Sequence, residues 1–343
     1  MKGDYFQDQI NKDGFCFVAE VSNNHLGDFG RYIRLIEEAS KCGAHAVKIQ
    51  TYTPESLLAP GRFCDVITEG PWSGQSYFDL YTSICAPIEW TDKLFEFARN
   101  KNIFLFSTPF STKDISILES VNCPAYKVSS FEFTDLTLWD QLAGLGKPLL
   151  ASTGISTDSE IKLVFANQVY RKNLSVLFNC VSAYPSNLSM LNLNKFDVLS
   201  LYGCKLGLSD HSLDVNSCIF SFARGVRVFE KHFTLSRSDG GPDSLFSLEP
   251  NELVSHLKVL RDCFAAQVGS QILTLEGMSH GRVVYAKSAI KKGECFAMGN
   301  VSCFRPYHSD AVSSLYVKDL LDKASKHSYD IGDIILKEEL GLG

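Results

Sequence analysis

The sequence lacks the features of several classes of protein. It has no apolar run approaching the roughly eighteen residues that a membrane-spanning helix needs, and residues 1–15 are polar and unlike a signal peptide. It has no run rich in Lys and Arg, and its formal net charge is −6 at pH 7. Because nucleic-acid surfaces are basic, we expect a protein that binds neither nucleic acid nor a membrane.

Disulfide and zinc frameworks are also not expected. The chain has eleven cysteines, none of them in a CxxC pair, and 343 residues are enough to bury a core without disulfides. Several cysteines, such as Cys16 and Cys180, lie in or beside apolar runs. We therefore expect reduced thiols that fill the core of a cytoplasmic protein.

Most of the chain alternates short apolar runs with amphipathic helical patterns. The apolar runs lie at residues 15–19, 44–47, 103–106, 125–126, 148–151, 175–178, 205–208 and 226–229. Helical patterns cover residues 31–42, 90–102, 112–121, 136–145, 213–224 and 251–264. Gly43, Gly146 and Gly225 follow helical patterns, where a left-handed C-cap is expected. Eight such units predict an α/β protein with a (β/α)8 TIM barrel.

The pattern changes after residue 265. We expect the barrel at residues 1–265, a linker at 266–282 that includes the polar stretch 271–281, and a small β-rich domain at 283–343. In this last part the order apolar, Gly, acidic, apolar occurs around Gly293 and again around Gly332, which indicates an internal pseudo-repeat. About 60 residues form a marginal core, so this domain is expected to lean on the barrel or on a partner subunit.

Reactive polar residues follow the predicted strands, where a TIM barrel carries its active site. They are Glu20, Lys48, Gln50, Ser107, Thr108, Phe110, Lys127, Ser130, Ser152, Asn179, Ser182, Tyr184, Ser209, Asp210, His211, Glu230, Lys231 and His232. Any single Ser or Thr here could instead cap a helix. Their recurrence at the same place in each unit favours an active site.

Two histidines could hold a metal ion. His211 and His232 follow predicted strands seven and eight, so both imidazoles can point into one barrel mouth. Two nitrogen ligands, with waters and substrate oxygens completing the shell, suit Mn²⁺ best, with Co²⁺ or Mg²⁺ as alternatives. Either histidine taken alone could equally be structural.

Two lysines indicate an anion site. Lys48 and Lys127 end strands two and four, and such a lysine can form a Schiff base or bind a phosphate or carboxylate. Hydroxyls at Ser130, Ser152, Ser182 and Ser209 favour the anion site, and a Schiff-base aldolase would not need both histidines. With Glu20 as the acidic group, the set suits joining a phosphorylated small molecule to a carbonyl compound.

The motifs resemble those of the sialic acid synthase family, which condenses phosphoenolpyruvate with an N-acetylated hexosamine. They are AEVSNNH at 19–25, KIQT at 48–51, STPF at 107–110, YKVSSFE at 126–132, STG at 152–154, GLSDHS at 207–212 and EKHF at 230–233. Residues 289–294 and the following part of the chain, through Arg305 and Pro306, resemble that family's antifreeze-like (SAF) domain.

Within the family, four stretches resemble the pseudaminic acid branch, which uses 2,4-diacetamido-2,4,6-trideoxy-altrose. They are residues 49–57, 71–72 with 79–81, 87–90 and 129–132. The alternatives are the same chemistry on an N-acetylneuraminate or legionaminate precursor, and an inactive sugar-binding scaffold. The loop 237–243 combines features of more than one branch. A scaffold would predict the loss of a metal ligand or a phosphate lysine, and neither is lost.

The resemblance implies a role for each matching residue. His211 and His232 would hold the metal that polarises the sugar aldehyde, and Glu20 is the first choice for proton transfer. The residues implied to hold or line the site of phosphoenolpyruvate are Lys48, Lys127, Ser130, Ser152, Ser209, Thr108, Phe110 and Ser182. Those implied to contact the sugar or the attacking water are Gln50, Tyr184 and Asp243, and Glu132 belongs to the same substrate-binding set.

The resemblance also implies a domain-swapped homodimer. Arg305 matches an arginine of the SAF domain that would reach the sugar in the barrel of the partner subunit. A guanidinium suits such recognition of hydroxyls and anions. The sequence after it, Tyr307 to Asp310, departs from the family's glycine-containing turn, and a surface arginine is the alternative interpretation.

Overall fold

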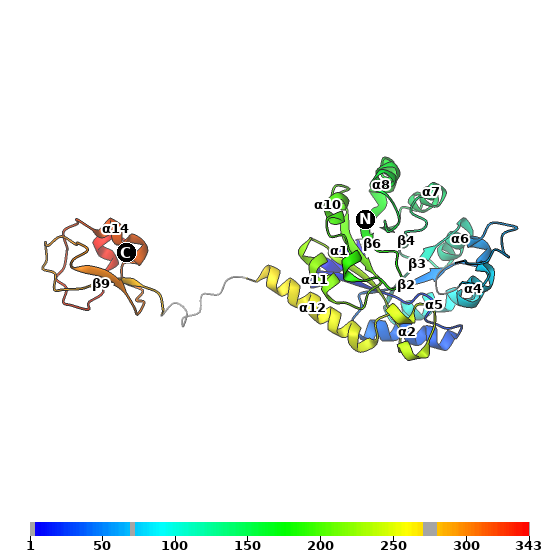
Figure 1. Ribbon diagram of the computed structural model, residues 1–343, viewed down its shortest axis with the longest axis horizontal. Coiled ribbons are helices and arrows are strands. Elements are labelled where there is room, and N and C mark those ends of the chain that lie inside the picture. Colours follow the sequence, from blue (N-terminus) through cyan, green and yellow to red (C-terminus); the bar gives the residue numbers. More distant parts are fainter. Residues whose placement is uncertain (1–3, 69–72, 270–279, 343) are drawn as a thin grey trace. The chain divides into compact units, whose positions relative to one another are not determined.

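The computed structural model describes residues 4–68, 73–269 and 280–342. The chain divides into two compact units, Met1–Val268 and Gly269–Gly343 (Figure 1). Residues 270–279, which fall in the stretch expected as a linker, lie outside the described part.

Eight parallel strands close into a barrel in chain order. They are β1 Cys16–Glu20, β2 Ala46–Thr51, β3 Phe104–Pro109, β4 Tyr126–Val128, β5 Leu149–Ser152, β6 Leu174–Cys180, β7 Lys205–Asp210 and β8 Val228–His232. The strands are almost entirely buried because the barrel interior and the surrounding helices cover both faces. The predicted (β/α)8 barrel is confirmed.

Helices surround the barrel, as Figure 1 shows. They are α2 Phe29–Lys41, α3 Pro54–Leu57, α4 Tyr77–Ile84, α5 Thr91–Asn100, α6 Thr112–Ser120, α7 Leu136–Gly144, α8 Asp158–Val164, α9 Gln168–Asn173, α10 Lys195–Ser200, α11 Asn216–Ala223 and α12 Pro250–Val268. The six predicted helices appear within a few residues of their expected ends. Gly43, Gly146 and Gly225 have φ of +100°, +65° and +92°, the left-handed conformation expected after a helix.

Besides α8, α9 and α10, which belong to the repeating units of the barrel, two parts of the barrel unit were not among the expected elements. The polar N-terminal segment forms α1 Tyr5–Asp13, which Asp4 caps through its side chain. Its Phe6 is fully buried and packs edge-on against Phe104 and Phe106. Since β3 begins at Phe104, α1 covers the end of the barrel opposite the predicted site. The other part is α3 and α4, which lie between β2 and β3.

The C-terminal unit has little regular strand. It contains one antiparallel pair, β9 Val283–Ala286 with β10 Val301–Phe304, and the short helix α14 Val317–Leu320. Isolated bridges, such as Ile290 with Tyr329, join the rest around a separate apolar core. Gly293 and Gly332 have φ of +86° and +90°, so both halves of the predicted pseudo-repeat place a left-handed glycine after an apolar segment.

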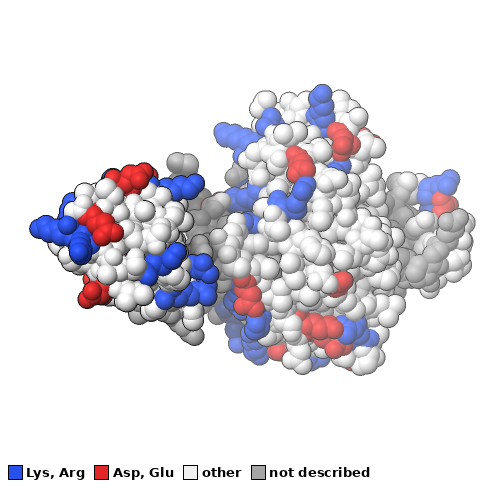
Figure 2. Space-filling view, turned by 60° about the vertical axis from the view of Figure 1, so that its left-hand side comes forward, with Lys and Arg blue, Asp and Glu red and all other residues white. Residues whose placement is uncertain are grey.

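The surface of the described residues carries mixed charge. On the face in Figure 2, Lys and Arg side chains are interspersed with Asp and Glu side chains. No helix of the described residues is both long enough and apolar enough to cross a membrane.

Candidate active site

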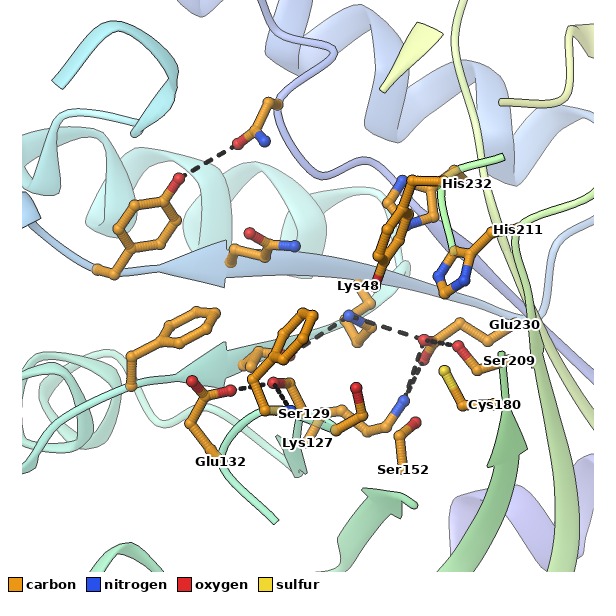
Figure 3. Close-up of a pocket in the computed structure, with 18 of the residues that line it drawn as sticks. Lys48, Lys127, Ser129, Glu132, Ser152, Cys180, Ser209, His211, Glu230 and His232 are labelled. Carbon is orange, nitrogen blue, oxygen red and sulfur yellow. Dashed lines mark hydrogen bonds and ion pairs between the residues drawn. The ribbon is translucent and has the colours of Figure 1, made fainter. Parts of the chain in front are cut away.

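A buried cluster of charges occupies the barrel at the carboxyl ends of its strands. Lys127 Nζ lies 3.0 and 2.9 Å from the two carboxylate oxygens of Glu230, and Ser209 Oγ donates to Glu230 Oε1 at 3.0 Å. Lys48 Nζ lies 2.6 Å from Glu20 Oε2 and 3.9 Å from Glu230 Oε1. Figure 3 shows Lys48, Lys127 and Ser209 converging on Glu230. All five residues are at most 5% exposed.

Burial and charge act differently on the two carboxylates. Burial raises the pKa of Glu20 to about 7, since the attraction of Lys48 does not fully offset it. Burial also acts to raise the pKa of Glu230, but Lys127 and Lys48 outweigh it and hold that pKa well below its usual range. Glu230 is therefore a fixed anion, whereas Glu20 can exchange a proton near neutral pH, as a general acid or base must.

The lysines line a cavity of about 270 Å³ that also has unused hydrogen-bonding capacity. Ser152 Oγ is buried in its wall and has no hydrogen-bond partner in the described part of the chain. Thr108 Oγ1 accepts a hydrogen bond from Lys48 Nζ at 3.3 Å. Because an unpaired buried hydroxyl is costly, the arrangement suits an incoming anion that accepts from Ser152 and the lysines.

Ser130 lines this cavity, and its hydroxyl is hydrogen-bonded to a residue outside the cavity. Its Oγ lies 2.8 Å from Ser182 Oγ, and Ser182 itself lines a neighbouring cavity. Gly154 makes this packing possible, since a Cβ there would lie 2.2 Å from Ser182 Oγ and 3.0 Å from Ser130 Cβ. Ser182 thus reaches the site through Ser130.

The two histidines fit a metal site. His211 and His232 have ring centroids 5.2 Å apart and both line the cavity. His211 Nδ1 lies 2.8 Å from the carbonyl oxygen of Val181, to which it can only donate, so Nε2 is left as an acceptor. Burial lowers the pKa of both rings, which keeps them in the neutral form that binds metal.

Among the residues that the structure describes, the histidines have no third protein ligand. Within the described ranges, no group of three or more His, Cys, Asp or Glu could hold an ion. His232 Nδ1 is buried, 3.6 Å from Asp243 Oδ2, and has no hydrogen-bond partner among the described residues. A donor set of two imidazoles leaves room for water and substrate oxygens, as expected from the sequence.

A second lobe of about 400 Å³ joins the cavity beside His232. Gln50, Tyr184 and Asp243 line it, and Gln50 Nε2 also donates to Glu20 Oε1 at 3.3 Å. Phe110 and Glu132 line the first cavity. Apart from Glu20 and Ser182, all the residues predicted to bind the metal or the substrates in the barrel unit line these two connected cavities. Ser182 lies behind the wall, and Glu20 contacts Lys48 and Gln50. Asp210 and Lys231, which also follow strands, pair with each other outside the barrel.

Arg305 lies in the other unit, directly after β10. Its Nε donates to the carbonyl oxygen of His280 at 2.6 Å, and the side chain is exposed. The structure describes this unit by itself.

The sequence-based analysis missed part of the site. It named Glu230 among the polar residues that follow the strands but gave an acidic role only to Glu20, whereas Glu230 lies 2.9 Å from Lys127 Nζ and 3.9 Å from Lys48 Nζ. Strand alternation could have placed Glu230 in the site, because it is two residues before His232 and so faces the same side. Cys180, expected to fill the core, lines the cavity, and α4 forms one wall of the second lobe.

The Schiff-base alternative does not fit this geometry well. Burial lowers the pKa of Lys127, which a nucleophilic amine needs. However, both oxygens of Glu230 lie within 3.0 Å of its Nζ, which holds the ammonium in place as a charged donor.

Comparison with known proteins identifies relatives along the whole chain. A model of the NeuB family matches residues 35–271. A pseudaminic acid synthase of Campylobacter jejuni is 35% identical, over 96% of this chain and 98% of its own. One of Helicobacter pylori is 34% identical, over 90% and 93%.

Solved structures agree with these relatives. The N-acetylneuraminic acid (sialic acid) synthetase of Leptospira borgpetersenii, solved in complex with citrate, superposes with a TM-score of 0.65 at 27% identity. The match covers 76% of this chain and 87% of that one. Since the family model spans more than half of the chain and both sequence relatives exceed 30% identity over nine-tenths of it or more, the chain belongs to the NeuB family, the family of sialic acid synthases.

Proposed function

We propose that this protein is a pseudaminic acid synthase. It condenses phosphoenolpyruvate, 2,4-diacetamido-2,4,6-trideoxy-altrose and water to give pseudaminic acid and phosphate. One observation carries the proposal. Two buried lysines, the unpaired hydroxyl of Ser152 and two neutral histidines line the same cavity at the mouth of the barrel. The relatives of this name support the choice of sugar.

Phosphoenolpyruvate is assigned to the lysine side of the cavity. Its phosphate and carboxylate need cationic and hydroxyl donors, which Lys48, Lys127, Ser130, Ser152 and Ser209 provide. Glu230 keeps both lysines charged and directs their ammonium groups into the barrel before substrate arrives. This preorganisation lowers the cost of stabilising charge as phosphate leaves.

His211 and His232 would hold the divalent ion, for which Mn²⁺ is our first choice. Such an ion supplies Lewis-acid polarisation of the sugar aldehyde when bound. The carbonyl of Val181 orients His211, and Asp243 lies beside His232.

The reaction forms one carbon–carbon bond and breaks one carbon–oxygen bond. C3 of phosphoenolpyruvate attacks the aldehyde carbon, whose oxygen takes up a proton and becomes a hydroxyl. Water then adds to the cationic C2 and loses one proton. The bond between C2 and the phosphate ester oxygen breaks, its electron pair leaves with phosphate, and the new hydroxyl gives its remaining proton to phosphate and becomes the ketone oxygen. Glu20, with its pKa near 7 and its contact with Gln50, is placed to exchange one of these protons.

The C-terminal unit is proposed to act as an SAF domain in a domain-swapped homodimer of a cytoplasmic enzyme. Arg305 of one chain would then contact the sugar in the barrel of a second copy. Replacing Arg305 with Ala should raise the KM for the sugar by about tenfold or more, since a lost hydrogen bond from a charged donor costs about 1.5–3 kcal/mol. The KM for phosphoenolpyruvate should stay unchanged, and equal effects on both substrates would contradict the role.

The direct test is Mn²⁺-dependent phosphate release from phosphoenolpyruvate. The diacetamido-altrose should support release far better than N-acetylmannosamine or the legionaminate precursor. Preference for either of the others would keep the chemistry and change the substrate. Release with none, by a folded protein loaded with Mn²⁺, would favour a scaffold.

A further inference from the structure

Helix α4 has an apolar face that the barrel core does not use. Tyr77, Leu80, Tyr81 and Ile84 follow the spacing i, i+3, i+4, i+7, which places them on one side of the helix. All four line the second lobe of the cavity. Leu80 is only 8% exposed, yet it does not belong to the hydrophobic cluster that fills the described barrel.

Further apolar groups complete this wall. Ile67, which is 7% exposed and also outside the core cluster, lines the same lobe with Pro242. Phe131 and Tyr77 stand at the lobe with 56% and 37% of their surface exposed. Four of the six residues that line only this lobe are apolar or aromatic, namely Ile67, Tyr77, Leu80 and Pro242, and the polar two are Ser22 and Asp243.

The orientation of the sugar follows from the rest of the site. C1 must lie beside His211 and His232 to meet phosphoenolpyruvate on the lysine side. The carbon chain then leaves His232 toward the second lobe, since the lysines occupy the other direction. Asn23, Gln50 and Asp243 can bind hydroxyl and amide groups along the chain, and Leu80 and Ile67 line the lobe into which the end that carries C6 would extend.

We infer that the apolar wall of Ile67, Tyr77 and Leu80 receives the C6 methyl group of a 6-deoxy sugar and discriminates against a sugar with a hydroxymethyl group there. This inference rests on the proposed function and deepens it. A hydroxyl placed against these side chains would lose its water without gaining a partner. An apolar site distinguishes such pairs by about 10- to 100-fold in kcat/KM.

The test compares two sugars that differ in one oxygen atom. They are the 2,4-diacetamido-2,4,6-trideoxy-altrose and its 6-hydroxy analogue, each supplied with phosphoenolpyruvate and Mn²⁺ to the full chain. The wild-type protein should prefer the 6-deoxy sugar by roughly 10-fold or more. L80N, which is close to leucine in shape but polar, should reduce this ratio by about tenfold and leave the KM for phosphoenolpyruvate unchanged.

Two control variants isolate the wall. T82N puts the same residue into α4 at an exposed position that does not line the lobe, and L80M keeps the wall apolar. Both should retain the wild-type ratio. If L80N fails to fold, the nearly isosteric pair I67T and I67V makes the same comparison.

The outcomes separate the two proposals. If both L80N and I67T keep the wild-type preference for the 6-deoxy sugar, the proposed role of the apolar wall is wrong. It is also wrong if T82N reduces this preference as much as L80N does. Activity on neither sugar in the folded, Mn²⁺-loaded wild-type protein overturns the proposed function, and the wall falls with it.

Discussion

The inside of the barrel and the outer face of β7 and β8 carry buried polar and charged groups that differ in how completely they are paired. Inside the barrel, Ser152 Oγ has no partner and the pKa of Glu20 is raised to about 7. Outside, Lys231 Nζ lies 2.7 Å from Asp210 Oδ2 and donates to the carbonyl oxygen of Ser212 at 2.7 Å. Asp210 and Lys231 are register partners on neighbouring strands.

The outer pair is surrounded by donors. Ser212 donates to Asp210 from its backbone N–H and from its hydroxyl, both at 3.0 Å, and Ser217 Oγ donates to the same carboxylate. Burial acts to raise the pKa of Asp210, and the charge of Lys231 with these hydrogen bonds lowers it below its usual value. The charged groups on the outer face are paired with protein groups, whereas the inner face has polar groups that can still bind a ligand.

The difference shows how one strand serves two purposes. Because side chains alternate, His232 and Glu230 enter the cavity while Lys231 between them points outward. The outer pair joins β7 to β8 and holds the turn that carries His211. We therefore expect inner changes to reduce activity and outer changes to reduce stability.

The largest effect is expected at His232. H232A should lower turnover by roughly a thousandfold, since it removes a ligand of the polarising ion. The unfolding temperature should hardly change, because His232 Nδ1 has no hydrogen-bond partner to lose. Phosphate release, thermal unfolding and Mn²⁺ titration by calorimetry measure this, with the exposed His327 as the H327A control. A fully active H232A enzyme would refute the metal site.

The next largest effect is expected at Asp210, where stability should fall and activity should largely remain. D210N leaves the charge of Lys231 buried without its partner and should cost about 3–5 kcal/mol in the free energy of unfolding. Activity at saturating Mn²⁺ should persist, although the Mn²⁺ concentration required should rise by about tenfold, since the turn that carries His211 loosens. Urea unfolding gives the first quantity, and the double variant D210N/K231M should recover most of it. If D210N is as stable as the wild type, the expectation that changes on the outer face reduce stability is wrong.

A smaller effect is expected at Ser152 on the inner face. S152A should raise the KM for phosphoenolpyruvate by about 10- to 100-fold, which corresponds to a lost hydrogen bond to a charged group. Its stability should match or exceed that of the wild type, because the hydroxyl is unpaired. Initial rates over a range of phosphoenolpyruvate concentrations test this, and an unaltered KM would remove Ser152 from the anion site.

The smallest effect is expected at Ser217, the outer counterpart of Ser152. Its Oγ contacts a carboxylate oxygen of Asp210 and lies 2.7 Å from the carbonyl oxygen of Asp214, and either of these can accept its one hydrogen. S217A should lower the free energy of unfolding by about 1 kcal/mol and leave both KM values unchanged. If it raised the KM for phosphoenolpyruvate as S152A does, the two faces would not be functionally separate.

The sequence predicted the barrel and most of the site because both depend on local patterns. Strand runs, helical periodicity and capping glycines are local, and polar residues after strands meet at one end of any such barrel. Which residues pair inside the barrel depends on register across different strands, so the ion pairs of Glu230 were not predicted. The apolar face of α4 was missed for a related reason, because its spacing is that of any helix packed on a core.

The contact between His211 and Val181 has a consequence for how the protein tolerates mutation. The group that orients this imidazole is a main-chain carbonyl, and every amino acid has one. Val181 can therefore be replaced by other amino acids without loss of the contact. A mutational scan would find that most substitutions at this position are tolerated. The position of the backbone, and not the side chain of residue 181, would then fix the orientation of His211. Only a mutation that shifts this backbone would be expected to disturb the proposed metal ligand.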